Sequence, residues 1–453
     1  MTATALQLNA TAFDGGAARA ALRIHQALFD HGPDFGWTSL FHATSGRALG
    51  LGPGVSAGSP LASSAIWRRL HPRLTQWRKR HWRTNNPALH SLAWPDTGLG
   101  AELIEAHSRG DFELLNLHWL GDSTLSIEEI GRLPCPVLWT LHDQWPFSGA
   151  EHYAPLPTSG EDLAGLERFT SAYERQTTPD LERTCDLNRW TWQRKQRSWR
   201  QPMTLICPSQ WMADCVQRSS LMGDWPCHVI PNPLNLQQWS PVEPLLARRL
   251  LDLPLEAPLV LFGAMGGTAD PRKGADVLER ALVSLAKRSE GQPKQPQLVI
   301  FGQEQSALRQ SFGLPVHCLG HLHDSVSLRL AYSAADVMVV PSRLDNLPNT
   351  ATEAMACGTP AIVSNNGALP EVVSHHKTGF VLPINQGLDP WISAMISLSE
   401  DSALYKSYGE AAESRIKDMF TWERAGTQTE AVYQQVVDQY NQSQQQIFLY
   451  YYS

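Results

Sequence analysis

Short apolar runs alternate with amphipathic stretches along most of the chain. Four of the runs, at 259–263, 298–302, 337–340 and 361–364, have the length of a strand. Continuous apolar runs of this length are typical of parallel strands that are covered on both faces. Further strands are expected at 6–10, 114–119, 137–141 and 204–207, and helices around 21–28, 127–133, 186–199, 275–287, 328–334, 350–357 and 422–440. This alternation predicts an α/β fold with parallel sheets, interrupted by irregular stretches at 43–63 and 150–185.

The stretch that follows the run at 337–340 contains the clearest local signals. Thr350 is followed three residues later by Glu353, a spacing that predicts a capping box at the start of a helix. Gly358 and Pro360 then predict the end of that helix. The sequence here indicates a buried strand, a tight loop, a capped helix and a second strand.

Two carboxylates, Asp345 and Glu353, flank the loop of this unit. A loop that joins the carboxyl end of a parallel strand to a helix N-terminus is where open α/β sheets bind ligands, and free amides there favour phosphate. Taken alone, Asp345 is equally well explained as a turn former and Glu353 as a cap. The surrounding residues favour a functional site.

A longer pattern surrounds the two carboxylates. Pro341-Ser342 is followed by Asp345, by seven further residues, by Glu353 and by the run Ala-Met-Ala-Cys-Gly-Thr-Pro. This pattern resembles the donor-site signature of retaining glycosyltransferases of family 4, whose GT-B fold consists of two Rossmann-like domains facing across a cleft. The wording Asp-Asn-Leu-Pro-Asn-Thr, and Thr-Leu-His142-Asp-Gln-Trp-Pro-Phe upstream, is similar to the colanic-acid and exopolysaccharide branch of that family.

The resemblance implies donor-site roles in the second half of the chain. Asp345 would contact hydroxyls of the donor sugar, Glu353 the ribose, the loop amides the distal phosphate, and Lys273 the diphosphate. Lys273 also precedes an expected helix, where a cation opposes the macrodipole and therefore calls for a nearby anion. The donor-binding residues implied in this way are Gly16, Lys273, Asp345, Asn346, Leu347, Asn349, Thr350 and Glu353.

Two departures from the family pattern concern the same site. Asp345 stands where most relatives have glutamate, which shortens the reach of the carboxylate by one methylene. The arginine that normally precedes the lysine by a few residues is absent, and the sequence leaves open whether Arg272 replaces it.

The first half of the chain is implied to contribute the acceptor side. His142 follows an expected strand at the Thr-x-His position, which in the family lies beside the reacting sugar. The implied catalytic residues are thus His142, Asp345 and Lys273, and the implied acceptor-side residues are Gly15, His118 and Asp143. The glycine pair at 15–16 could equally satisfy a turn, and a lone histidine is more often structural.

Domain boundaries are expected from the same comparison. Ile230-Pro-Asn232 resembles the Ile-Pro-Asn-Gly motif that closes the first domain of the family, which places the linker near 233–245. We expect an acceptor domain over 1–235 with basic, tryptophan-rich insertions, a nucleotide-sugar donor domain over 236–418, and a helix over 419–453 that crosses back to the first domain. The tail beyond 440 is expected to be disordered or to form an edge interaction.

Composition narrows the setting of the protein. The net charge of −7 gives no reason to expect nucleic acid as a partner. Seven cysteines without a C-x-x-C pair indicate reduced thiols and a cytoplasmic location, and argue against zinc. His321 and His323 lack further ligands nearby in the sequence, so neither a metal nor another cofactor is expected. The N-terminus does not resemble a signal peptide, and no apolar window of about 18 residues could span a bilayer.

Basic and aromatic residues are concentrated in one segment of this acidic chain. Residues 67–83 contain seven Lys or Arg and three Trp, and residues 186–199 form a second basic, tryptophan-bearing segment. The segment at 67–83 suits an anionic membrane surface or a phosphate-bearing lipid acceptor. A solvated basic helix on the domain edge explains it equally well.

The sequence therefore predicts a retaining glycosyltransferase that moves a sugar from a UDP- or GDP-linked donor. The expected acceptor is a glycan or a polyprenyl-diphosphate-linked glycan in surface polysaccharide biosynthesis, reached at the inner face of the plasma membrane. Two alternatives remain open: a catalytically inactive GT-B scaffold, which the two departures favour, and a nucleotide-sugar epimerase on the same fold.

Overall fold

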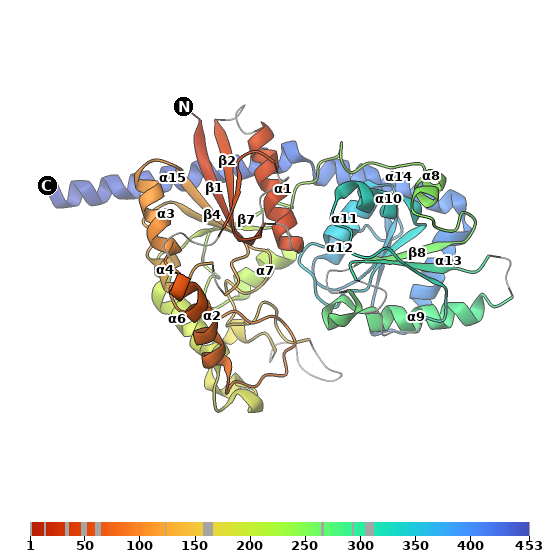
Figure 1. Ribbon diagram of the computed structural model, residues 1–453, viewed down its shortest axis with the longest axis horizontal. Helices are drawn as coiled ribbons and strands as arrows, with labels where there is room; N and C mark the ends of the chain where they lie inside the picture. Colours follow the sequence, from red (N-terminus) through yellow and green to blue (C-terminus); the bar gives the residue numbers. More distant parts are fainter. Residues whose placement is uncertain are drawn as a thin grey trace. The chain divides into compact units, whose positions relative to one another are not determined.

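The chain forms two compact units of parallel α/β structure (Figure 1). The computed structural model describes residues 2–12, 15–31, 36–46, 52–58, 65–122, 124–156, 166–263, 267–291, 294–303 and 312–452. Unit 1 consists of Met1–Pro233 and Trp422–Ser453, and unit 2 of Leu234–Thr421. The expected pair of Rossmann-like domains is confirmed.

Unit 1 contains a seven-stranded parallel sheet in the order β3-β2-β1-β4-β5-β6-β7. The strand order reverses between β1 and β4, which is the switch point where sheets of this type bind ligands. The strands are β1 Ala3–Thr11, β2 Trp37–Ser45, β3 Val55–Ala57, β4 Leu114–Leu117, β5 Val137–Thr140, β6 Thr204–Cys207 and β7 Cys227–Val229. The helices are α1 Gly16–His31, α2 Ala65–Lys79, α3 Leu99–Ser108, α4 Ile127–Gly131, α6 Leu187–Ser198, α7 Gln210–Arg218 and α15 Trp422–Tyr452, with 3-10 turns η2 Arg168–Ser171, η3 Arg175–Thr177 and η4 Asp180–Glu182.

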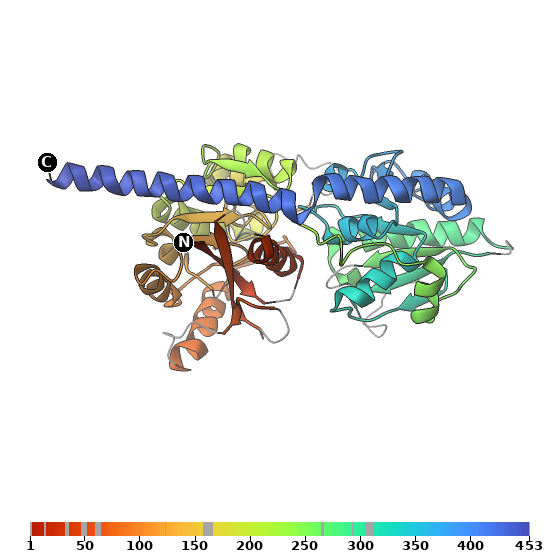
Figure 2. The same cartoon turned by 90° about the horizontal axis from the view of Figure 1, so that it is seen from above.

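Both faces of this sheet are covered. On one face, side chains of β4, β5 and β6 pack with those of α3, α4, α6 and α7 in the larger core. On the other face, α1 and α15 pack against the sheet, and Tyr433 of α15 is completely buried there. Figure 2 shows α15 running along unit 1 as one long helix. The expectation that the C-terminal helix returns to the first domain is confirmed, because α15 belongs to unit 1.

Three sequence expectations for unit 1 were wrong in detail. The last helix does not end near 440 in a disordered tail, because α15 continues to Tyr452. The stretch 43–63 is not entirely loop, since β3 pairs with β2 within it, while residues 47–51 and 59–64 lie outside the described part of the chain. The described part of 150–185 is ordered by η2, η3 and η4 rather than irregular.

Unit 2 contains a six-stranded parallel sheet in the order β10-β9-β8-β11-β12-β13. The four strands expected from apolar runs form its centre, and β8, β11 and β12 are buried along their whole length. The strands are β8 Leu259–Gly263, β9 Gln297–Phe301, β10 Val316–Cys318, β11 Val337–Val340, β12 Ala361–Ser364 and β13 Gly379–Leu382. The helices are α8 Pro244–Leu250, α9 Ala275–Arg288, α10 Ser325–Ala334, α11 Asn349–Ala356, α12 Leu369–Val372, α13 Asp389–Glu400 and α14 Ser402–Met419, with turns η5 Gly267–Ala269 and η6 Pro271–Lys273.

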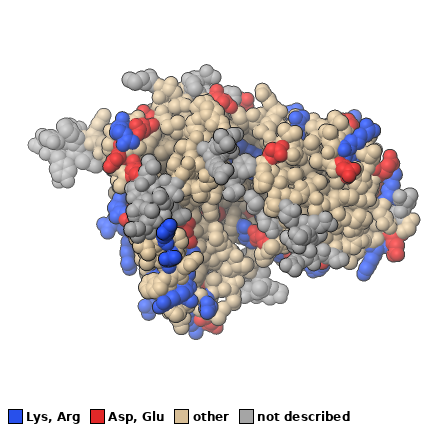
Figure 3. Space-filling model, viewed as in Figure 1, with Lys and Arg blue, Asp and Glu red and all other residues tan. Residues whose placement is uncertain are grey.

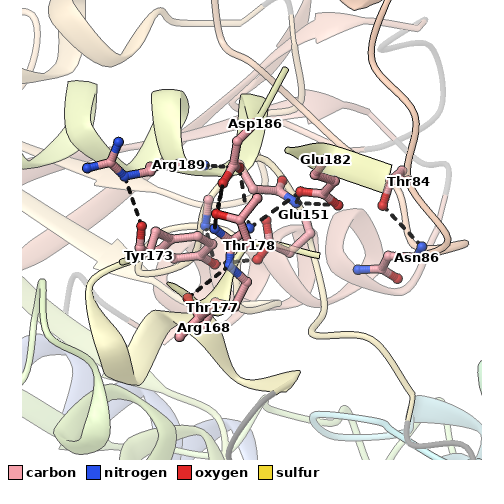
Figure 4. A network of polar contacts seen from close by, with 12 residues as sticks. Thr84, Asn86, Glu151, Arg168, Tyr173, Thr177, Thr178, Glu182, Asp186 and Arg189 are labelled. Carbon is pink, nitrogen blue, oxygen red and sulfur yellow. Dashed lines mark hydrogen bonds and ion pairs between the residues drawn. The ribbon is translucent and has the colours of Figure 1, made fainter. Parts of the chain in front are cut away.

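Glu151, Glu182 and Asp186 lie around one buried cation, Arg168 (Figure 4). Its guanidinium is 4% exposed and lies 2.6 Å from Asp186 Oδ2 and 3.4 Å from Glu182 Oε2. Thr178 also accepts from Arg168, at 3.2 Å. A buried cation is tolerated when its donors are paired in this way, so Glu182 and Asp186 have a structural role.

Glu151 lies at the edge of the same network and is 3% exposed. The Tyr173 hydroxyl donates to Glu151 Oε1, and the Gly149 amide donates to Tyr173 at 2.6 Å. Within the described ranges, Glu151 Oε2 has no hydrogen-bond partner. Burial raises the pKa of Glu151 to about 7, although Tyr173 and Arg168 act in the opposite direction.

This raised pKa predicts a pH-dependent stability. Between pH 4.5 and about 7 the unfolded chain ionises Glu151 while the folded chain keeps it protonated, so the free energy of unfolding falls as pH rises through that window. The loss reaches about 3 kcal/mol at most. The free energy of unfolding in urea is measured for wild type and for Glu151→Gln at pH 5 and pH 7.5. The wild-type value minus the variant value should fall by this amount between the two pH values. The exposed Glu174→Gln should show none, and an equal pH dependence in both differences would contradict the assignment.

Candidate active site

The loop between β11 and α11 in unit 2 is fixed from two sides. The Ser364 hydroxyl at the end of β12 donates to the carbonyl of Ser342 at 2.5 Å. Further along, the Ala368 amide donates to the carbonyl of Asp345 at 3.0 Å. Gly367 has a φ of +59°, and a Cβ there would lie 2.3 Å from the Asp345 oxygen. The backbone of Gly367 therefore packs closely against the backbone of Asp345.

Lys273 provides the cation of the site. Its Nζ lies 2.6 Å from Asp345 Oδ2, and both side chains are mostly buried, at 23% and 11% exposure. The turn that carries Lys273 packs against the strand end, because a Cβ on Gly274 would lie 1.9 Å from the Pro341 oxygen. The sequence predicted an anion beside Lys273. In the structure this anion is Asp345, which is 72 residues away in the chain.

Two arginines lie close to the Lys273 turn. Arg272 pairs with Asp270 at 2.6 Å, so its guanidinium is engaged within its own turn. Arg343 lies in the β11–α11 loop, pairs with Asp276 at 2.6 Å and donates to the Pro271 carbonyl at 2.9 Å. The side-chain hydrogen bond from Arg343 lowers the pKa of Asp276. Sequence reasoning considered only Arg272 and missed Arg343, which reaches the turn from the loop after β11.

Helix α11 begins differently from the prediction. Its first residue is Asn349 and its N-cap is Pro348, which offers no side-chain cap, so the capping box of Thr350 and Glu353 was wrong. Glu353 is instead 1% exposed, and Tyr332 of α10 donates to its Oε2 at 2.7 Å. Without a side-chain cap, amides of the first helical turn remain suited to an anion.

The remaining residues of unit 2 that the sequence predicted for donor binding lie around this helix start. Asn346 is buried and Leu347 packs against the core, whereas Asn349 and Thr350 are partly exposed at the first turn. The helix ends in a Schellman motif, because the Thr359 and Gly358 amides donate to the carbonyls of Ala354 and Met355. The glycine stop predicted from the sequence is thus confirmed, with a φ of +77° at Gly358.

In unit 1, two histidines meet at the carboxyl ends of β4 and β5. His118 Nδ1 lies 2.9 Å from His142 Nε2, and the rings stack with centroids 5.2 Å apart. His118 Nε2 lies 3.0 Å from Gln7 Oε1, which can only accept. A neutral His118 therefore accepts at Nδ1 from the Nε2–H of His142, which leaves His142 Nδ1 as an acceptor.

Burial keeps this histidine pair neutral. Desolvation lowers the pKa of His142 to about 4, and burial beside His142 lowers the pKa of His118 as well. Gln7 is in turn held by Asn116 and Tyr433, with distances of 2.9 and 3.2 Å to Gln7 Oε1. Sequence reasoning missed this support from α15, because Tyr433 lies 426 residues from Gln7 in the chain.

The carboxylate of Asp143 is used inside its own loop. Asp143 Oδ2 lies 2.5 Å from His152 Nδ1, and Oδ1 accepts from the Trp145 amide at 3.0 Å. Burial raises the pKa of Asp143, but the charge and hydrogen bond of His152 outweigh it, so the net pKa is lowered. These bonds shape the loop that carries His142.

A buried lysine fixes the same loop. Lys195 of α6 is completely buried and donates to the carbonyls of Trp145, Ser148 and Gly149, the last two at 3.0 and 2.8 Å. Its Nζ also lies 3.8 Å from the centre of the Trp145 ring. Burial lowers the pKa of Lys195. The second basic segment of the sequence therefore contributes cations to the interior of unit 1.

The glycine pair has the geometry that the sequence predicted for a turn. Gly15 has a φ of +94° and precedes α1, whose first residue is the exposed Gly16. The structure thus places the candidate residues in two sets. Unit 1 contains Gly15, Gly16, His118, His142 and Asp143, and unit 2 contains Lys273, Asp345, Asn346, Leu347, Asn349, Thr350 and Glu353. Within the described ranges, no three His, Cys, Asp or Glu side chains form a metal-binding group.

Sequence comparison covers mainly unit 2. Residues 258–415 match the family model described as Glycosyl transferases group 1. The D-inositol 3-phosphate glycosyltransferase of Xylanimonas cellulosilytica is 32% identical over 46% of this chain and 51% of its own length. The alpha-maltose-1-phosphate synthase of Mycolicibacterium smegmatis is 29% identical over 46% of this chain and 57% of its own. The chain spans about half the length of the curated relatives it matches. Similarity to group 1 glycosyltransferases is therefore established for residues 258–415 only.

Structural comparison covers both units. Sucrose-phosphate synthase from Thermosynechococcus elongatus matches with a TM-score of 0.63 at 19% identity, over 96% of this chain and 99% of that chain. Anabaena Alr3699/HepE in complex with UDP-glucose matches with a TM-score of 0.62 at 15% identity, over 95% and 99%. The glycosyltransferase WaaG matches with a TM-score of 0.58 at 13% identity, over 94% and 99%. These likenesses show that the chain has the GT-B fold.

Proposed function

We propose that this chain is a retaining glycosyltransferase whose nucleotide-sugar donor binds to unit 2. The observation that carries the proposal is the 2.6 Å pair between Lys273 of the turn η6 and Asp345 of the loop that leads into α11. A cation, a carboxylate and the amides of a helix start are there close together, within the region that matches group 1 glycosyltransferases. This combination suits a sugar that is linked to a diphosphate.

The pair suggests how donor binding proceeds. Without donor, Lys273 and Asp345 neutralise each other. We propose that the diphosphate takes over Lys273, which releases the Asp345 carboxylate to accept hydrogen bonds from sugar hydroxyls. Lys273 and the first amides of α11 then stabilise the negative charge that develops on the departing diphosphate. Glu353, oriented by Tyr332, is proposed to accept from the ribose.

Donor binding provides the direct test. Lys273→Ala and Glu353→Gln should each weaken binding of UDP-glucose or a GDP-sugar by about tenfold or more in titration calorimetry, because each removes a charge-assisted bond worth about 1.5–3 kcal/mol. Lys287→Ala, an exposed lysine near the end of α9, serves as the matched control and should bind as wild type does. Undiminished affinity in both site variants, with folding intact by circular dichroism, would sink the donor-site assignment.

The histidine pair of unit 1 is proposed to serve the acceptor. A neutral His142 that donates to His118 keeps Nδ1 free of a proton, so this atom can accept a hydrogen bond from an acceptor hydroxyl. Gly15 is proposed to line the same side, and Asp143 to hold the loop. This arrangement positions a hydroxyl without requiring a protonated histidine.

Two rival functions are separated by turnover. A transferase consumes the nucleotide sugar only when an acceptor is present, an epimerase changes the sugar without one, and an inactive scaffold does neither. The similarity to D-inositol 3-phosphate glycosyltransferases adds a small phosphorylated alcohol to the acceptors worth testing. Our preferred acceptor is a polyprenyl-diphosphate-linked glycan in surface polysaccharide synthesis.

That preference rests on the exposed face of α2. Leu70 and Trp77 are 40% and 52% exposed, and Arg69, Arg73 and Arg80 are exposed near them. Their spacing places them along one side of the helix. Figure 3 shows Lys and Arg side chains gathered over this part of unit 1. Exposed indole and leucine beside arginines are what an anionic membrane surface attracts.

Two other cations of the 67–83 segment are used within unit 1. Arg78 stacks on Trp190 at 4.5 Å, and Lys79 pairs with Asp122 at 2.7 Å. Membrane attachment is therefore proposed for the exposed arginines only, as a peripheral contact on the cytoplasmic face. Among the described helices, none combines the length and hydropathy needed to cross a bilayer.

Liposome flotation tests the membrane contact. Wild type should float with anionic vesicles at low salt and detach at high salt, because each cation near the surface contributes about 1 kcal/mol that salt screens. The Arg73→Ala, Trp77→Ala, Arg80→Ala triple variant should stay at the bottom. Arg197→Ala, Arg200→Ala with Leu181→Ala removes the same number of exposed cations elsewhere on unit 1 and should float. If the first triple variant floats equally well, the face is merely solvated and a water-soluble acceptor becomes the better proposal.

A further inference from the structure

Two cysteines of unit 1 lie in contact across neighbouring strands. Cys207 is the last residue of β6 and Cys227 the first residue of β7, and their sulfur atoms are 3.3 Å apart. The parallel register pairs Leu205 with Cys227 and Cys207 with Val229. Because side chains two residues apart share a face of a strand, the two thiols lie diagonally on the same face of the sheet.

The two thiols differ in access. Cys207 is completely buried, whereas Cys227 is partly exposed on β7, the last strand in the order of this sheet. The hydrogen bond between them raises the pKa of Cys207 and lowers that of Cys227. A thiolate is the reactive form of cysteine, so the accessible partner is also the more readily ionised one.

We propose that Cys207 and Cys227 are a reversible dithiol site that a small disulfide such as glutathione disulfide oxidises to a disulfide bond. In the first step the Cys227 thiolate attacks one sulfur of glutathione disulfide, forms a mixed disulfide and releases one glutathione. In the second step Cys207 loses its proton and attacks the Cys227 sulfur, which releases the second glutathione. Two electrons pass to the oxidant, and the two thiol protons end on the two glutathione molecules.

The movement required is small, which is why this pair rather than another carries the proposal. The sulfurs must approach from 3.3 Å to a bond length of about 2.0 Å. A third thiol, Cys215 of α7, packs in the same core, but burial raises its pKa to about 11 and it is completely buried. The disulfide would join the end of β6 to the start of β7, the last strand before the chain enters unit 2 at Leu234.

The test uses the full chain and counts its thiols. The reduced protein is equilibrated with glutathione disulfide, denatured, alkylated and analysed by intact mass and peptide mapping. We expect two fewer alkylatable thiols than the seven of the sequence, one cross-linked peptide containing Cys207 and Cys227, and full recovery with dithiothreitol. Cys207→Ser should instead retain one glutathione on Cys227, because the resolving thiol is missing.

Cys185→Ser is the matched control, since Cys185 is also a partly exposed thiol of unit 1. This variant should still form the cross-link. The proposal is overturned if oxidised wild type keeps all seven thiols, or if the cross-link joins Cys215 to either partner. A Cys207→Ser variant that also loses two thiols would overturn it too. If a serine variant fails to fold, the number of alkylatable thiols in oxidised wild type still tests the proposal.

Discussion

Gly274→Ala is expected to destabilise unit 2 by about 3 kcal/mol or more and to abolish measurable donor binding. A left-handed backbone already costs a residue with a Cβ about 1–2 kcal/mol. At Gly274, where φ is +67°, the added Cβ would also lie 1.9 Å from the carbonyl oxygen of Pro341. That oxygen is backbone at the end of a buried strand, so no side-chain rotation relieves the contact. The turn carrying Lys273 must move away from Asp345.

Gly291→Ala separates the two causes. Gly291 has a φ of +79°, and nothing lies within 4 Å of its added Cβ. This variant should lose only the conformational part, about 1–2 kcal/mol in urea unfolding, and should bind donor normally in calorimetry. If Gly274→Ala loses no more stability than Gly291→Ala and still binds the nucleotide sugar, the close packing of the Lys273 turn is not what forms the site.

Asp345→Asn is expected to reduce kcat/KM by about 10- to 100-fold, whereas Asp345→Glu should remain within severalfold of wild type. An amide cannot fully replace a carboxylate that accepts from sugar hydroxyls, and such charge-assisted bonds are worth about 1.5–3 kcal/mol. The amide also leaves Lys273 without the anion that lies 2.6 Å away. Glutamate keeps the charge and adds reach.

The control for charge removal is Asp389→Asn, because Asp389 pairs with Arg288 on the surface at 80% exposure. Surface ion pairs contribute little, so turnover and stability should stay close to wild type. Steady-state kinetics with saturating acceptor give the comparison. Equal kinetics for Asp345→Asn and wild type would support a role for Asp345 in the turn alone.

Much of the architecture of unit 2 could be predicted from local sequence. The runs 259–263 and 337–340 consist of consecutive apolar residues. Such runs fit central parallel strands, because these strands are buried on both faces. The end of α11 was equally local, since Gly358 adopts a conformation that other residues resist. Three-residue strands such as β3 and β7 were missed. Their own composition does not identify them as strands, and they are strands because they pair with β2 and β6.

Local signals failed where a distant partner competed for the same group. The spacing of Thr350 and Glu353 predicted a cap, but Tyr332 takes the Glu353 carboxylate and Pro348 occupies the cap position. The buried carboxylate went to the neighbour that best compensates its loss of water.

The sequence by itself determined the α/β class, the central strands and the residue types of the site. Only the tertiary structure decided which of these residues meet. Lys273 and Asp345 are 72 residues apart, and Gln7 and Tyr433 are 426 apart, so no local pattern contains either contact. The physical reason is that parallel strands place their carboxyl ends on one edge of a sheet, whatever the length of chain between them. Side chains at that edge become neighbours through strand order, which packing of the whole unit sets.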